Sequence, residues 1–184
     1  QFGDSVPDLE DPQALVNLVK AINALRAQGQ RIEALEAGRS YANLQDAVNA
    51  IGNSRATIRI APGTYRQCAV QEGGVIVYEA PQPGSVIFMG RACEGKAAIV
   101  ARGRSTTVVG LIFQNIRVPD ANGAGIRLER GNLTVRQSWF RDSEQGILSA
   151  NDPTGAVLIE QSTFTRLGRC DRGLSCAHSI YLGD

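Results

Sequence analysis

Long hydrophobic runs are absent from the 184-residue sequence, and so is a leader in which basic residues precede an apolar stretch. A membrane-spanning helix needs about 20 consecutive apolar residues, so the sequence predicts no membrane span. Acidic and basic residues nearly balance, with a formal net charge of +1, which gives no electrostatic argument for nucleic acid. We therefore expect neither a membrane span nor a nucleic-acid partner.

Lysine and aromatic residues are also scarce. Only Lys20 and Lys96 are lysines, and the other basic residues are arginines, whose planar guanidinium suits carboxylate, sulfate or phosphate groups. A compositional bias of the source genome is the alternative explanation for this excess. Aromatic residues make up 5% of the chain, whereas 20 glycines and many short runs of Val, Ile and Thr favour an all-β domain with tight turns.

Residues 1–38 are predicted to form a separate N-terminal segment, extended at first and then an amphipathic helix over 12–37. Pro12 after Asp11 is a helix start signal, and Gly38 is a stop signal. Apolar residues recur at alternating steps of three and four, at Leu15, Leu18, Ile22, Leu25 and Ile32. This spacing is typical of a coiled-coil seam and predicts a homo-oligomer through the helix. A helix lying along the flank of the β domain would bury the same stripe.

Residues 39–184 are predicted to form the β domain, which begins with a capping helix at 44–51. The apolar positions of this helix share one face and are Leu44, Ala47, Val48 and Ile51. Thr57–Ile60 follows as a predicted strand that ends at a Pro-Gly turn. We expect the helix to close one end of a stack of strands, which would otherwise expose unpaired backbone and apolar core.

Beyond residue 56 the sequence is a series of short apolar runs separated mostly by Gly, Asn, Asp or Pro. Three runs align at Phe113, Phe140 and Phe164, with steps of 27 and 24 residues. A second set aligns at Ile99, Ile126, Ile147 and Ile180. The unequal steps indicate a fixed ladder of strands with loops of variable length. A repeat of this kind predicts a parallel β-helix rather than a β-sandwich, whose strands need no such register.

The four cysteines allow three disulfide pairings. Cys68 and Cys93 lie 25 residues apart, close to the repeat length, so we expect one to lie above the other and to pair. Cys170 and Cys176 share one loop and are expected to form the second bridge. Two bridges imply an oxidising compartment and hence a secreted, periplasmic or cell-surface protein.

A metal site is the alternative use of the second cysteine pair. Asp171 and His178 would supply further ligands. The spacing matches no recognised zinc pattern, so we expect no metal and no cofactor.

The capping helix and the segment Thr57–Arg66 resemble the N-terminal cap and first coil of the right-handed parallel β-helix, pectate-lyase-like superfamily. Asn122–Arg127 and Ala177–Gly183 resemble segments of uncharacterised bacterial secreted β-helix-repeat proteins. The resemblance covers about residues 41–184. It implies an all-β right-handed parallel β-helix with an N-terminal capping helix, preceded here by the amphipathic, coiled-coil-like helix. It implies no single activity, because this scaffold hosts lyases, hydrolases, esterases, epimerases and non-catalytic spikes.

The catalytic motifs of the best-known enzymes of that superfamily are not found. The Gln-Asp and Asp-Phe pairs of pectin methylesterases have no match in context, and the Asn-Thr-Asp, Asp-Asp and Gly-His-Gly motifs of polygalacturonases are absent. The calcium-binding Asp cluster and Arg-containing strand of pectate lyases cannot be mapped. These activities are disfavoured unless the coils that carry them lie beyond Asp184.

The candidate site consists of outward positions beside the isoleucine ladder. Arg127 and Tyr181 are expected two strand spacings apart, about 10 Å at ~4.8 Å each, which suits a groove for sugar units. In a lyase acting on uronic acids, Arg127 would neutralise the carboxylate while His178 or Tyr181 removes the C5 proton. His178 has the alternative role of a structural hydrogen-bonding residue.

A hydrolase would need two carboxylates. The candidates are Glu129, Asp142 and Glu144. Turn capping and solvated surface charge are the alternative roles of Asp142 and Glu144. The candidate substrate-binding residues are Arg127, Arg141 and Trp139, the last either as a sugar-stacking platform or as a residue packed under a loop.

Two functions follow from these features. The first is a secreted protein that acts on or binds an acidic polysaccharide in a side groove and is a lyase or hydrolase if it is an enzyme. The second is a non-catalytic structural or adhesive module, oligomerised by its N-terminal helix. Because the sequence ends in or just after a strand, we expect either further coils or a partner chain, such as a second copy, over this open C-terminal edge.

Overall fold

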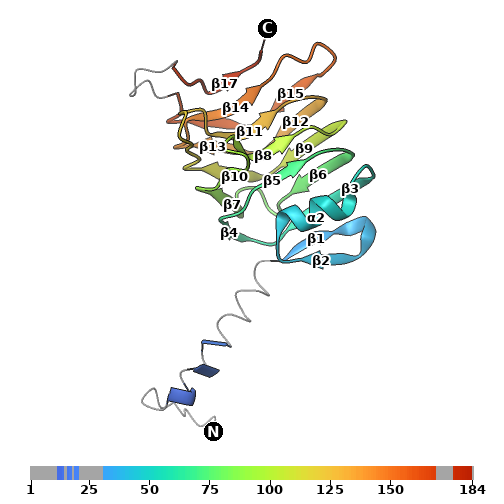
Figure 1. The fold of residues 1–184 in the computed structure, drawn as a ribbon, viewed down its shortest axis with the longest axis vertical. Coiled ribbons are helices and arrows are strands. Elements are labelled where there is room, and N and C mark those ends of the chain that lie inside the picture. Colours follow the sequence, from blue (N-terminus) through green and yellow to red (C-terminus); the bar gives the residue numbers. More distant parts are fainter. Residues whose placement is uncertain (1–11, 15, 18, 21–30, 169–175, 184) are drawn as a thin grey trace.

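The computed structural model describes residues 12–14, 16–17, 19–20, 31–168 and 176–183 (Figure 1). The first three ranges are helical. Four of the five predicted seam residues lie outside the described residues, so the coiled coil stays a prediction. The fifth, Ile32, belongs to strand β1 (Ile32–Ala34), which precedes the 3-10 helix η1 (Leu35–Ala37). The prediction of a helix across residues 32–34 is therefore wrong.

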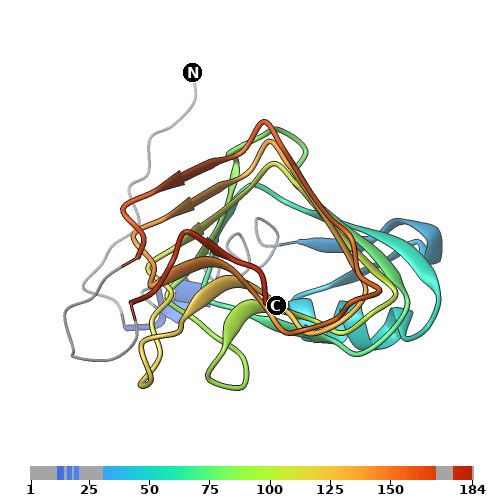
Figure 2. The ribbon, with the colours of Figure 1, turned by 90° about the horizontal axis from the view of Figure 1, so that it is seen from above.

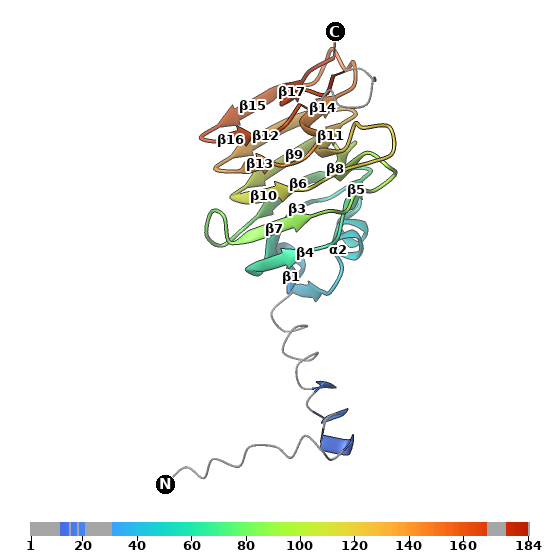
Figure 3. The ribbon, with the colours of Figure 1, turned by 90° about the vertical axis from the view of Figure 1, so that its left-hand side faces the viewer.

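Three sheets of parallel strands make up the body of the molecule, and the chain visits them in turn (Figures 1 and 3). The parallel strands of sheet A are β3 (Arg55–Ile60), β6 (Val75–Glu79), β9 (Ser105–Val109), β12 (Asn132–Arg136) and β15 (Val157–Glu160). Sheet B contains β4 (Gly63–Tyr65), β7 (Val86–Met89), β10 (Leu111–Gln114), β13 (Trp139–Arg141) and β16 (Thr163–Thr165). Sheet C contains β5 (Ala69–Gln71), β8 (Ala97–Ala101), β11 (Ala124–Leu128), β14 (Gln145–Ser149) and β17 (Ile180–Tyr181).

Each set of one strand from sheets A, B and C forms a layer, numbered here 1 (β3–β5) to 5 (β15–β17). Seen from above, the layers superpose along three sides (Figure 2). The chain therefore turns a corner between sheets A and B, between B and C, and between C and A of the next layer. The last of these corners carries the site described below.

The predicted all-β right-handed parallel β-helix is wrong, because sheet A is mixed and helices are present. β1 pairs antiparallel with both β2 (Arg39–Tyr41) and β3, and the chain also contains η1 and helix α2 (Leu44–Ile51). Ile32 and Ala34 are both buried while Glu33 between them is not, which is the two-residue period of a strand. These residues therefore follow the alternation of a strand and not the three-and-four spacing that predicted a helix. The described fold is mostly β, in one mixed and two parallel sheets.

The two predicted ladders of core residues are confirmed. Phe113 pairs with Phe140, which pairs with Phe164, and the ring centroids are 5.0 and 4.8 Å apart. The isoleucine ladder also holds in register, with the pairs Ile99–Ile126, Ile126–Ile147 and Ile147–Ile180. The aromatic stack starts two strands earlier than predicted, since Phe88 and Tyr65 continue it toward α2.

Helix α2 occupies the predicted residues and covers the layer-1 end of the core. The side chain of Asn43 accepts a hydrogen bond from the backbone N–H of Gln45 at 2.8 Å, which caps the helix. Its buried face is formed by Leu44, Ala47, Val48 and Ile51. At the other end the core is less covered, since Ile180 is 38% exposed whereas Ile147 below it is 0% exposed.

The predicted Cys68–Cys93 disulfide is confirmed, with Cα atoms 5.5 Å apart. It joins the corner between sheets B and C in layer 1 to the same corner in layer 2. Cys170 lies outside the described residues, so its pairing with Cys176 stays a prediction, and Cys176 is disulfide-bonded. In the part of the chain that the structure describes, no helix is long and apolar enough to cross a membrane.

Candidate functional site

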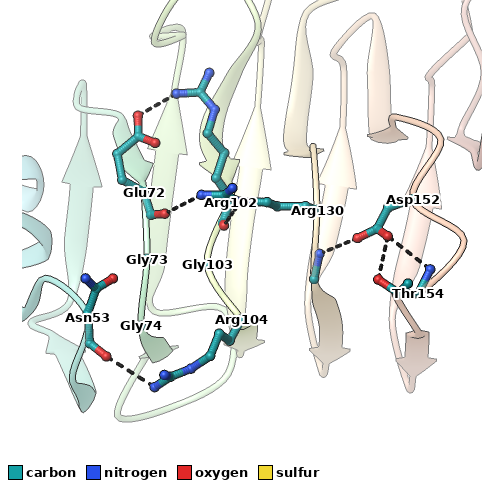
Figure 4. A pocket seen from close by; sticks show the side chains of 11 residues that line it. Asn53, Glu72, Gly73, Gly74, Arg102, Gly103, Arg104, Arg130, Asp152 and Thr154 are labelled. Atoms are coloured by element: carbon teal, nitrogen blue, oxygen red, sulfur yellow. Dashed lines mark hydrogen bonds and ion pairs between the residues drawn. The ribbon is translucent and has the colours of Figure 1, made fainter.

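A groove, called here the corner groove, runs along the corner where the chain passes from sheet C to sheet A (Figure 4). Its central hollow measures about 360 Å³ and is walled by Arg102, Arg104 and Arg130. A hollow of about 250 Å³ beside α2 shares Asn53, Glu72 and Gly73 with it. Another of about 220 Å³ toward layer 5 shares Gly131 and Asp152. The three hollows form one elongated depression across the layers.

The floor of the corner groove is bare backbone because the stacked turns leave no room for side chains. A Cβ atom on Gly131 would lie 2.1 Å from the carbonyl oxygen of Gly103, and φ of Gly131 is +80°. A Cβ on Gly103 would lie 2.6 Å from the carbonyl oxygen of Gly73, and one on Gly155 2.6 Å from that of Gly131. Only glycine allows the turns to approach this closely.

A buried glutamine supports the floor from inside the stack. Gln71 is 0% exposed, and its Nε2 donates to the carbonyl oxygens of Gly73 and Ser105 at 3.1 Å each. Its Oε1 accepts from the hydroxyl groups of Tyr78 and Thr106. All of these polar groups are satisfied in the interior, which holds the turn at Gly73 in place. Burial raises the pKa of Tyr78, so this hydroxyl stays protonated and can donate.

Two arginines of the wall keep their charge uncompensated. Arg104 Nη2 donates to the carbonyl oxygen of Asn53 at 3.2 Å, and Arg130 Nη2 donates to that of Glu72 at 3.0 Å (Figure 4). Arg130 Nε also donates to the carbonyl oxygen of Arg102. Neither Arg104 nor Arg130 forms an ion pair with a carboxylate that the structure describes. Neutral carbonyl groups fix these guanidinium groups in place and leave their positive charge for an anion.

Arg102 is different, because three carboxylates surround it. Its guanidinium pairs with Glu72, Glu94 and Glu129, and Lys96 also pairs with Glu129 at 2.6 Å. The hydrogen bonds that Arg102 donates to Glu94 and Glu129 raise the pKa of Arg102. Burial alone would raise the pKa of Glu129, but the hydrogen bonds from Arg102 and Lys96 outweigh it, and the pKa is lowered. We call these five residues the ion-pair cluster.

Asp152, the other acidic residue at the corner groove, is held in its own turn. Its carboxylate accepts from the backbone N–H of Gly131 at 2.8 Å and from the N–H and hydroxyl of Thr154 at 3.0 and 2.7 Å (Figure 4). The hydrogen bonds from Thr154 and Gly131 lower the pKa of Asp152. The carboxylate therefore stays ionised, so it contributes negative charge to the groove while its hydrogen bonds hold it in its own turn.

The three predicted catalytic carboxylates contact different partners. Glu129 belongs to the ion-pair cluster, and Asp142 pairs with Arg166 at 2.5 Å. Glu144 is 3% exposed and accepts the backbone N–H groups of Val118 and Gly123, at 3.0 and 2.8 Å. It thus anchors the loop between β10 and β11. Their role as the two carboxylates of a hydrolase stays a prediction.

The predicted lyase residues lie on the outer face of sheet C. Arg127 is in register with Leu148 and Leu148 with Tyr181, so Arg127 and Tyr181 are two strands apart. The rings of His178 and Tyr181 stack with centroids 5.4 Å apart. The Nε of Arg127 is buried and is the one such side-chain atom without a hydrogen-bond partner in the part of the chain that the structure describes. Their catalytic role stays a prediction.

The predicted substrate-binding residues of β13 contact neighbouring side chains and turns. Arg141 Nε donates to Gln114 Oε1 at 3.0 Å. The Trp139 ring packs against the turn at Gly84, since a Cβ there would lie 3.5 Å from Trp139 Cζ3. This contact agrees with the alternative role of Trp139, packing against a loop.

The corner groove was not predicted from the sequence. The sequence feature that could have indicated it is the recurrence of Gly beside Arg between the apolar runs, as in Arg102–Arg104 and Arg130–Gly131. Among the described residues, no group of three or more His, Cys, Asp or Glu is placed to hold a metal ion. No family model, curated protein or solved structure matches the chain.

Proposed function

We propose that the protein binds an acidic polysaccharide along the corner groove and does not cleave it. The observation that carries this proposal is an elongated, glycine-floored groove with two arginines that pair with no carboxylate among the described residues. Sugar carboxylates accept paired hydrogen bonds from guanidinium groups, and the bare floor allows a sugar ring to approach the backbone.

The shape of the groove favours a polymer over a single sugar. Arg104 and Arg130 follow β8 and β11, which are neighbours in sheet C, so their turns are about 4.8 Å apart along the stack. The adjoining hollows extend the depression toward α2 on one side and layer 5 on the other. Successive residues of a chain laid along the corner would meet successive turns.

The electrostatics favour an anion. The central hollow is lined by three arginines and two acidic residues, and Asp152 is engaged by its turn while Glu72 pairs with Arg102. The three arginines outnumber the two carboxylates, so the lining of the central hollow carries a net positive charge. Part of the affinity comes from exposed charges, so it falls as ionic strength rises.

The state of Glu129 supports binding without cleavage. A glycosidase needs one carboxyl group with a raised pKa as its acid, whereas the pKa of Glu129 is lowered by its basic neighbours. The confirmed disulfide favours an oxidising compartment, which supports secretion and an extracellular polymer.

The test is a titration of the 184-residue protein with polygalacturonate and with neutral dextran, by calorimetry at low and high salt. We expect saturable binding to polygalacturonate that weakens with salt, and no binding to dextran. Arg104→Gln with Arg130→Gln should lower the affinity about tenfold or more, because charge-assisted hydrogen bonds are lost. Arg39→Gln is the control, since Arg39 is exposed on β2, away from the groove.

Equal binding to dextran, or an unchanged affinity in the double variant, would overturn the proposal. Release of unsaturated product or reducing ends during the titration would contradict the absence of cleavage.

A structural or adhesive module is the second candidate, and the exposed end of the stack favours it. Leu158, Ile180, Tyr181 and Leu182 are between 38% and 49% exposed there. A second copy would pair with the free strand edges of layer 5 and cover these side chains. A monomeric mass at all concentrations in light scattering would exclude this candidate.

A further inference from the structure

A second hollow, called here the disulfide groove, lies at the corner between sheets B and C beside α2. It measures about 520 Å³ and shares no lining residue with the corner groove. The side chains of Arg66 and Arg91 line it together with amide side chains and the Cys68–Cys93 bridge. None of the described residues that line it is acidic. We propose that the disulfide groove binds one compact oxyanionic group, a carboxylate or a sulfate.

Arg66 and Arg91 both bring positive charge to the lining of this one hollow. A Cβ atom on Gly90 would lie 3.5 Å from Arg66 Nη1, so the Arg66 guanidinium lies over the residue that precedes Arg91. Arg66 contacts the side chain of Met89, with 4.0 Å between Arg66 Nη2 and Met89 Sδ. Neither arginine pairs with a carboxylate that the structure describes. An anion between two like charges relieves their repulsion and accepts hydrogen bonds from both forks.

The walls of the disulfide groove are held by hydrogen bonds and by the covalent bridge. Gln67 Oε1 accepts from the backbone N–H of Leu44 at 2.8 Å, and its Nε2 donates to the carbonyl oxygen of Ala42 at 3.0 Å. Gln45 forms the same pair of bonds with the backbone of Val70, at 2.7 and 2.9 Å. These amides connect α2 to layer 1, and the Cys68–Cys93 bridge connects layer 1 to layer 2.

The groove is therefore formed before a ligand arrives, which lowers the entropic cost of binding. Its composition also separates it from the corner groove. The corner groove includes two carboxylates and extends over several layers, whereas the disulfide groove has two cationic side chains at one place. This arrangement suits one compact anionic group and goes beyond the proposed binding of a polymer.

The test is a titration with four small probes, inorganic sulfate, glucuronate, glucose 6-sulfate and neutral glucose, followed by NMR chemical-shift changes of backbone amides. We expect saturable shifts around Gly90 and Cys93 with the three anions and none with glucose. Comparison of glucuronate with glucose 6-sulfate identifies the preferred oxyanion. Arg66→Gln and Arg91→Gln should each weaken binding about tenfold or more.

Arg104→Gln is the matched control, since it alters the corner groove and should leave these affinities unchanged. Arg91→Lys keeps the charge but removes the planar fork, and should fall between the wild type and Arg91→Gln. Both exposed arginines lie outside the core, and unchanged amide spectra elsewhere verify that each variant is folded.

Equal binding of glucose, or full affinity in the Arg66→Gln and Arg91→Gln variants, would overturn the proposal. Shifts that grow linearly without saturation would do the same, because they indicate a general ionic effect. Loss of polymer binding in Arg104→Gln with Arg130→Gln tests the corner groove alone, so either site can fail without the other.

Discussion

Two glycines of sheet C are required by a neighbouring aromatic ring. A Cβ atom on Gly125 would lie 2.6 Å from Phe140 Cδ1, and one on Gly146 would lie 2.8 Å from Phe164 Cδ1. Neither has a φ in the left-handed region, so the requirement is steric. The stack of phenylalanines thus occupies space that side chains at these positions would need. Only the paired register of sheets B and C reveals this dependence.

Gly125→Ala should destabilise the protein by about 1–3 kcal/mol, because the added methyl group overpacks the core against Phe140. Phe140 is 1% exposed and stacks on both neighbouring rings, so it cannot move aside freely. Urea denaturation of the variant gives the loss in the free energy of unfolding. In the double variant Gly125→Ala with Phe140→Leu, the loss in the free energy of unfolding should differ from the sum of the two single losses, since the smaller side chain frees space. Strict additivity would show that the two residues do not interact.

At the scale of elements, local sequence patterns correctly predicted the helices and strands that short-range contacts determine. Helix α2 follows from one apolar face and a capping residue, and the aligned Phe and Ile runs identified strands that do pair. β1 was missed because Ile32 continued the spacing of the preceding leucines, and three residues are too few to show alternation clearly. The strand forms because it pairs with β3, a contact of long range.

The candidate site was less predictable for the same reason. Arg104 and Arg130 meet at the corner groove because the turns of successive layers stack, although the loops elsewhere differ in length. The partners of Glu129 and Glu144 likewise come from other layers and loops. A list of outward positions cannot show which charges are compensated, since that depends on neighbours about two dozen residues away.

The ion-pair cluster connects the ends of three strands of sheet C and should make stability depend on pH. The pKa of Glu94 is lowered by hydrogen bonds from Arg102, and that of Glu129 is lowered despite burial. A carboxylate with a lowered folded pKa stabilises the protein above its unfolded pKa, about 4.3 for Glu, and this stabilisation is lost as pH falls through the folded pKa. The free energy of unfolding should therefore fall as pH is lowered below about 5.

Glu129→Gln should reduce this pH dependence, because one of the carboxylates that must be protonated is removed. Urea denaturation between about pH 3 and pH 7 measures the effect. Glu160→Gln is the matched control, since its pair with Arg136 is exposed, with side chains 45% and 51% accessible. A pH profile of Glu129→Gln that follows the wild type would contradict the role of the cluster.

At the scale of the whole molecule, the two ends of the stack differ. At one end α2 and β1 cover layer 1, so that Leu44 and Ile58 are 0% exposed. At the other end Ile180 and Tyr181 of layer 5 are 38% and 43% exposed. The disulfide groove lies away from this end, whereas the hollow of the corner groove toward layer 5 is lined in part by Leu182 and Gly183. Binding at the disulfide groove therefore leaves the strand edges of layer 5 accessible.

This asymmetry predicts that the two ends contribute unequally to stability. Leu44→Ala should cost about 2–5 kcal/mol, because it leaves a cavity between α2 and the core. Ile180→Ala should cost less than about 1 kcal/mol, since its side chain is already partly in water. Chemical denaturation of both variants at two protein concentrations measures the difference. If Ile180→Ala costs as much as Leu44→Ala, and more so at high concentration, a second copy covers layer 5 in solution.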